Sequence, residues 1–134
     1  MTSNELHREL AGRRILIVED ERLIALDMLD ILERWGCTVL GPVGTAAAAL
    51  EVVENDLPDG AILDVNLIGG TSEPVAEALA ERGRPFIVVT AYERGQLTGS
   101  LRNGPMLRKP LDEAKLQREL SALFSSSVGT MPVR

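Results

Sequence analysis

Five short apolar segments, separated by stretches with helical spacing, place the strongest limit on how this chain can fold. The segments are rich in Ile, Val and Leu, and they are RILIV (14–18), CTVLGPV (37–43), GAILDV (60–65), PFIVV (85–89) and PMLR (105–108). Two of them contain the unbroken apolar runs ILIV and FIVV. A strand without polar alternation is buried on both faces, as in a parallel sheet that helices cover on both sides.

The stretches between these segments have the patterns of amphipathic helices. An apolar stripe within 22–35 runs through Ile24, Met28, Ile31 and Trp35. Further helices are predicted at 46–55, 73–82 and 112–124. The segment 93–102 predicts only a weak helix, because it contains two glycines. This order of elements predicts an α/β doubly wound (βα)5 domain, a five-stranded parallel sheet with helices on both faces.

Length and composition are those of one globular domain. The chain has 134 residues, of which 45% are hydrophobic and 25% are charged, and this is enough apolar material for a single core. We expect a folded domain at 13–124, preceded by an N-terminal extension at 1–12. A disordered tail is predicted at 125–134, where the residues are mostly small and polar.

Charge, cysteine content and hydropathy argue against several classes of protein. A net charge of −6 argues against direct binding to nucleic acid. Every apolar run falls short of the roughly 18 residues of a transmembrane helix, and the N-terminus lacks the apolar stretch of a signal peptide. The single cysteine, Cys37, excludes an internal disulfide. We therefore expect a cytoplasmic protein that does not bind membranes.

Polar side chains stand at the carboxyl ends of the predicted strands, where open α/β sheets place their functional crevice. In chain order they are Glu19, Asp20, Glu21, Asp64, Asn66, Thr90 and Lys109. Carboxylates in one crevice repel one another unless a cation lies between them, and ligands that are all oxygen suit Mg²⁺. A lysine and a hydroxyl can grip a phosphoryl group. Taken singly, each residue has an ordinary explanation, such as a solvated helix N-terminus for the acidic run.

Together these residues predict a phosphoryl-transfer site with a carboxylate nucleophile. Asp64 would attack phosphorus, while Mg²⁺ would neutralise charge between Asp20, Asp64 and the incoming phosphoryl group. Lys109 would pair with the phosphoryl oxygens. The Thr90 hydroxyl would donate a hydrogen bond to the same group once it is present.

Four motifs, in this order and on these elements, resemble the receiver domains of response regulators in two-component signalling. They are ILIVEDE (15–21), ILDVNL (62–67), VVTAY (88–92) and LRKP (107–110), and the resemblance covers about residues 13–124. It implies a flavodoxin-like fold, with Asp64 as the phosphoacceptor and Glu19 and Asp20 as the acidic pair that binds Mg²⁺. The backbone carbonyl of Asn66 would complete the metal ligands. Thr90 and Lys109 would be the family's switch hydroxyl and lysine, with a cis bond between Lys109 and Pro110.

The chain departs from the common receiver pattern in two places. Met106 stands three residues before Lys109, where receivers usually carry Tyr or Phe. The loop VNLIGGTSEP (65–74) differs from the common turn after the phosphoacceptor, which usually contains a proline. Both features, with PFIVVTAY (85–92), resemble an alphaproteobacterial subgroup known by its PFxFATGY motif. The match is partial, because Val88, Val89 and Ala91 differ from it while Pro85, Phe86, Thr90 and Tyr92 fit. The subgroup implies a histidine kinase of the HWE or HisKA2 type as phosphodonor.

We therefore expect a single-domain receiver that a histidine kinase or a histidine phosphotransferase phosphorylates on Asp64. It would be a signalling protein rather than an enzyme, and it would bind an unknown downstream protein or act as a phosphate relay or sink. The weak segment 92–104, with Tyr92, is the expected output surface. One alternative is an aspartyl-phosphate phosphohydrolase, although Asn66 cannot act as the general acid of that class. The other is a receiver-like module that binds partners without phosphorylation, against which the complete set of site residues argues.

Overall fold

The apolar segments form one parallel sheet of five strands, as the sequence predicts. The computed structural model describes the backbone of residues 9–91 and 94–130, and the strand order is β2-β1-β3-β6-β7. The strands are β1 (Arg14–Val18), β2 (Thr38–Val43), β3 (Gly60–Asp64), β6 (Phe86–Thr90) and β7 (Met106–Arg108). Every neighbouring pair is parallel, so the carboxyl ends of all five strands lie at one rim.

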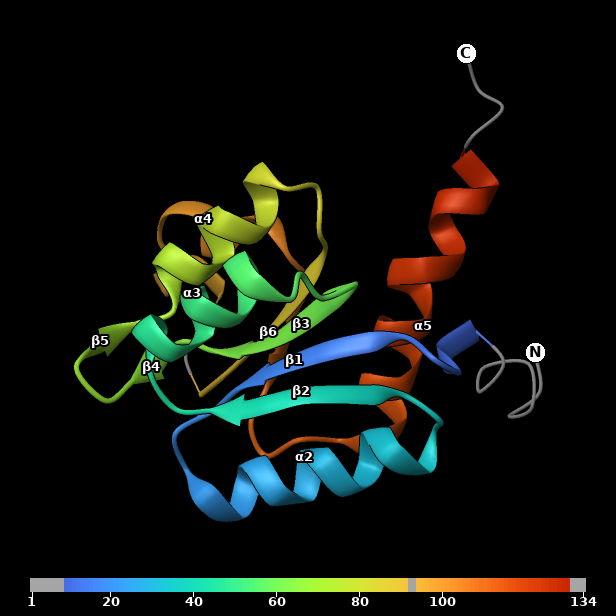
Figure 1. Ribbon diagram of the computed structural model, residues 1–134, viewed down its shortest axis with the longest axis horizontal. Helices are drawn as coiled ribbons and strands as arrows, with labels where there is room; N and C mark the ends of the chain where they lie inside the picture. Colours follow the sequence, from blue (N-terminus) through green and yellow to red (C-terminus); the bar gives the residue numbers. More distant parts are fainter. Residues whose placement is uncertain (1–8, 92–93, 131–134) are drawn as a thin grey trace.

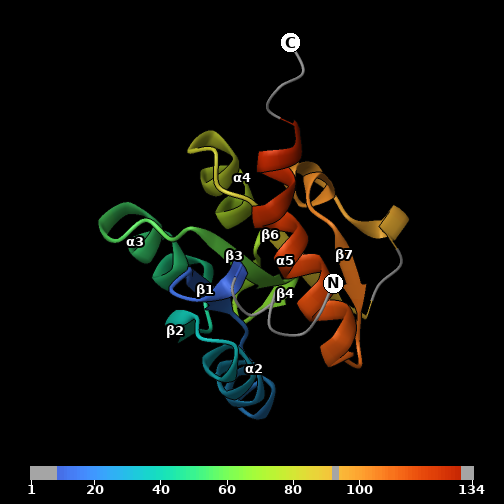
Figure 2. The same cartoon turned by 90° about the vertical axis from the view of Figure 1, so that its right-hand side faces the viewer.

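Helices cover both faces of this sheet (Figure 1). They are α2 (Arg22–Arg34), α3 (Ala46–Asn55), α4 (Glu73–Glu81) and α5 (Glu113–Thr130). Side chains alternate along β1, so that Ile15 and Ile17 pack with α2 and α5, whereas Leu16 and Val18 pack with α3 and α4. The turned view shows α3 and α4 on one side of the strands and α5 on the other (Figure 2). This confirms the doubly wound, flavodoxin-like α/β fold.

The segment between β6 and β7 does not form the predicted weak helix. Its described part contains two short 3-10 helices, η1 (Arg94–Gln96) and η2 (Gly99–Asn103). Gly99 has a φ of +55°, which breaks any continuous helix and which side chains with a Cβ rarely adopt. Leu97 and Leu101 are buried in the same apolar cluster as α4. Packing against α4 therefore replaces regular helix formation in this segment.

Both ends of the predicted domain differ in part from the sequence-based expectation. Helix α5 extends to Thr130, so it includes the first part of the segment 125–134 for which the sequence predicts a disordered tail. Residues 1–8 and 131–134 lie outside the described part of the chain, and the domain limits 13–124 stay a prediction. Leu10, within the predicted extension, is fully buried in the cluster with α2 and α5. Among the described helices, none has the length and apolar character needed to cross a membrane.

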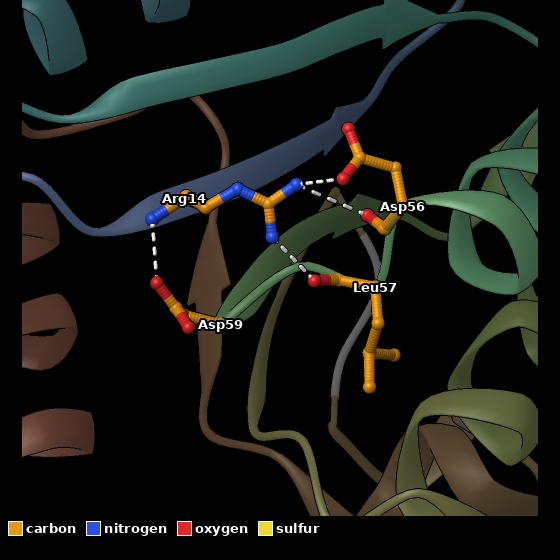
Figure 3. Close-up of polar contacts among 4 residues, drawn as sticks. All are labelled: Arg14, Asp56, Leu57 and Asp59. Atoms are coloured by element: carbon orange, nitrogen blue, oxygen red, sulfur yellow. Dashed lines mark hydrogen bonds and ion pairs between the residues drawn. The ribbon is translucent and has the colours of Figure 1, made fainter.

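Arg14, the first residue of β1, ties that strand to the loop before β3 (Figure 3). Its backbone N–H donates a hydrogen bond to Asp59 Oδ2 at 2.8 Å. Its guanidinium group donates to the carbonyl oxygens of Leu57 at 2.6 Å and Asp56 at 3.4 Å, and it also pairs with the Asp56 carboxylate. These contacts attach the first residue of β1 to the loop that leads into β3.

Candidate functional site

The register of β1 on β3 places an acidic residue just beyond the last paired position of each strand. These residues are Glu19 and Asp64, and both are buried, with 3% and 6% of their surfaces exposed. Thr90, the last residue of β6, is buried on the strand next to β3, one position after Val89, which pairs with Asp64. Its carbonyl oxygen accepts a hydrogen bond from the Lys109 backbone N–H at 2.9 Å. Residues from four strands therefore meet at the rim, as the sequence predicts.

The ammonium group of Lys109 lies among three carboxylates. Its Nζ atom is 3.4 Å from each of Glu19 Oε1, Glu21 Oε1 and Asp64 Oδ1. The contact with Glu21 is a hydrogen bond. The Lys109–Pro110 peptide bond is cis, as the family resemblance implies. About a fifth of the Lys109 side chain is exposed to solvent.

A cluster of oxygen atoms lies next to this ammonium group. Glu19, Asp20 and Asp64 each offer one carboxylate oxygen, and these atoms lie within 4.8 Å of one another. The Oε1 atom of Glu19 is buried and accepts no hydrogen bond within the described residues. Such an atom suits a hard cation, and a donor set made only of oxygen suits Mg²⁺. The residues present therefore fit Mg²⁺, which would be held by these three carboxylates.

Burial and mutual repulsion shift the ionisation of this site. Burial raises the pKa of Glu19 to about 7, and the charge of Asp64 adds to the rise, whereas Lys109 and the Glu21 N–H, which donates to Oε2 at 3.0 Å, oppose it. Burial also raises the pKa of Asp64, against the opposing charge of Lys109. Burial lowers the pKa of Lys109, but Asp64 and Glu19 outweigh that effect and leave the pKa raised. A divalent cation would relieve the excess of negative charge.

The loop after Asp64 is where the sequence departs from the common receiver pattern. It forms a small antiparallel hairpin of β4 (Asn66–Leu67) and β5 (Gly70–Thr71), with Ile68 exposed at its turn. Asn66 is exposed two residues beyond Asp64, and the role of its carbonyl oxygen as a metal ligand stays a prediction. Met106, in place of the usual aromatic residue, is half-buried at the beginning of β7. Tyr92 lies outside the described residues.

Sequence reasoning missed one member of the site. The sequence places Glu21 in the acidic run and predicts no role for it, whereas its side chain contacts Lys109, 88 positions away in sequence. The available signal was its place directly after the acidic pair, at the same rim as Lys109. Its position in the sequence does not predict which neighbouring residue the Glu21 side chain contacts.

Comparison with known proteins agrees with this geometry. The chain is 46% identical to SdrG from Sphingomonas melonis Fr1, whose solution structure superposes with a TM-score of 0.72 over 86% of this chain and 97% of SdrG. The response regulator PhyR from Brucella abortus superposes with a TM-score of 0.81 at 30% identity, over 96% of this chain and 54% of that protein. No protein-family model matches the chain.

A curated relative shows the same relationship. The phyllosphere-induced regulator PhyR from Methylorubrum extorquens is 36% identical over 130 residues, which are 90% of this chain and 48% of PhyR. The chain thus spans about half the length of the curated relatives it matches most fully. It belongs to the response regulator receiver domains of two-component signalling. Within them it is of the alphaproteobacterial PhyR-like type.

Proposed function

We propose that this chain is a cytoplasmic signalling receiver that accepts a phosphoryl group on Asp64 in a Mg²⁺-dependent reaction. The observation that carries the proposal is the position of the Asp64 carboxylate. It is buried at the end of β3, shares an oxygen cluster with Glu19 and Asp20, and lies 3.4 Å from Lys109 Nζ. A buried carboxylate of this kind needs compensating charge, which Lys109 supplies only in part.

The chemistry assigned to the chain's own residues is simple. A carboxylate oxygen of Asp64 attacks phosphorus, and the bond from phosphorus to the donor's imidazole nitrogen breaks as the new O–P bond forms. Lys109 Nζ pairs with the phosphoryl oxygens, and the Thr90 hydroxyl donates a hydrogen bond to them. Mg²⁺, held by Glu19, Asp20 and Asp64, would neutralise charge on the transferring group. The placement of these residues at one rim supports these roles.

A histidine kinase, of the HWE or HisKA2 type, or a histidine phosphotransferase is the phosphodonor in this proposal. Among the described residues, large exposed apolar side chains occur at Leu23 and Leu26 of α2 and at Ile68 of the β4–β5 hairpin. In sequence they lie within a few residues of Glu21 or of Asp64. Exposed apolar groups around a reactive carboxylate favour protein contact. Phosphorylation would then alter the segment 92–104 so that it binds a downstream protein. Alternatively, the chain would act as a phosphate relay or a phosphate sink.

Intact mass spectrometry tests this function. Incubation with acetyl phosphate and Mg²⁺ should add one phosphoryl group per chain, and excess chelator should prevent the addition. Asp64→Asn should abolish it, whereas Asp27→Asn, which changes an exposed carboxylate on α2, should not. Equal mass gain by the Asp64 variant, or by the wild type in chelator, would refute the assigned phosphoacceptor or the metal requirement respectively.

A further inference from the structure

Glu21 has an unusual place for an acidic residue at the beginning of a helix. It is the N-cap of α2, yet its side chain makes no capping hydrogen bond in the described structure. Its backbone N–H instead donates to the buried Glu19 carboxylate at 3.0 Å, which fixes the backbone at this position. Its Oε1 atom accepts a hydrogen bond from Lys109 Nζ at 3.4 Å. The side chain is therefore turned toward the phosphoryl site rather than toward the helix amides.

The three carboxylates around Lys109 differ in their exposure to water. The side chains of Glu19 and Asp64 are 0% and 8% exposed, whereas that of Glu21 is 64% exposed. A buried carboxylate that loses its cation keeps an uncompensated charge in a poorly solvated place. An exposed carboxylate exchanges the same contact for water at little cost. Glu21 is thus the partner that Lys109 can release most easily.

We propose that Glu21 is a positioning residue that holds Lys109 Nζ in the unphosphorylated state and leaves it when a phosphoryl group arrives on Asp64. The inference rests on the proposed function, because it assumes phosphorylation of Asp64. The Glu21 carboxylate takes the place that phosphoryl oxygens later occupy, so the exchange replaces one hydrogen bond to the ammonium group by another. Until it is displaced, its negative charge repels an approaching anionic donor and slows phosphorylation.

The test compares Glu21→Gln with the wild type in acetyl phosphate and Mg²⁺, with the rate of phosphorylation followed by intact mass. The variant keeps the size of the side chain and removes its charge, and Glu19 and Asp64 still hold Lys109. We expect phosphorylation to become about fivefold faster at low salt, the factor for one unit charge about 4 Å away in water-like surroundings. Between roughly 0.01 M and 1 M salt the Debye length falls from about 30 Å to about 3 Å, so the difference should largely disappear.

Glu33→Gln is the matched control, because Glu33 is exposed on the same helix at its opposite end. Its phosphorylation rate should equal that of the wild type. An unchanged or slower rate in Glu21→Gln would overturn the inference, as would an equal acceleration in Glu33→Gln or a difference that persists at high salt. If the wild type itself took up no phosphoryl group, the proposed function would fail and this inference with it. Uptake at equal rates would overturn this inference alone.

Discussion

The buried carboxylate of Glu19 should make the stability of the metal-free protein depend on pH. Folding raises the pKa of Glu19 from 4.5 to about 7, mainly through burial. Between these two values the folded chain holds a proton that the unfolded chain has released, so stability falls as pH rises. At about 1.4 kcal/mol per pH unit, the loss between pH 4.5 and pH 7 is about 3 kcal/mol. The stability that the protonated Glu19 contributes is fully present below pH 4.5 and is lost above pH 7.

Glu19→Gln isolates this effect from the titration of other groups. Glutamine keeps the length of the side chain and can still accept the hydrogen bond from the Glu21 N–H, but it does not ionise. In the presence of a chelator, the free energy of unfolding of the variant, measured relative to that of the wild type, should therefore rise by about 3 kcal/mol between pH 4.5 and pH 7. Saturating Mg²⁺ should reduce this gain, because a bound cation favours the ionised carboxylate of the wild type.

Urea unfolding monitored by the fluorescence of Trp35, the single tryptophan and a buried one, measures these free energies. Glu33→Gln, which changes an exposed glutamate at the far end of α2, serves as the control for losing a carboxylate elsewhere in the protein. A difference between the wild type and Glu19→Gln that stayed constant from pH 4.5 to pH 8 would show that Glu19 ionises normally in the folded protein. The argument from burial would then be wrong.

Three further predictions concern the segment between β6 and β7. Gly104→Ala should lower the free energy of unfolding by about 1–3 kcal/mol in urea titrations, because a Cβ there would lie 2.5 Å from the carbonyl oxygen of Phe86. Unchanged stability of this variant would refute the close packing at Gly104. Thr98→Val removes a hydrogen bond that Thr98 Oγ1 donates to Glu73 Oε1 at 2.8 Å, and amide exchange around η2 should become about fivefold faster if the bond contributes about 1 kcal/mol. Phosphorylation of Asp64 should likewise change amide exchange most within 90–106, and a change confined to α2 and α3 would contradict the expected output surface.

Local patterns of the sequence were sufficient to predict the sheet and the main site residues. The unbroken runs ILIV and FIVV require burial on both faces, and that condition is met by a parallel sheet between two helix layers. Parallel strands end at the same rim, so polar residues after each run had to converge there. For this reason Asp64, Thr90 and Lys109 could be assigned to one site from their order alone. The chemical type of each residue then indicated phosphoryl transfer.

Contacts between distant parts of the chain decided the remaining features. In the described part of the segment after Thr90, glycines weaken helix formation locally, whereas the burial of Leu97 and Leu101 in the cluster with α4 is a tertiary contact. The pKa of Glu19 rises because the folded chain removes water from it. Glu21 contacts Lys109 because the ends of β1 and β7, far apart in sequence, lie at the same rim of the folded sheet. Side-chain direction, burial and charge pairing at the rim therefore depend on the tertiary structure, whereas the composition of the rim follows from the sequence.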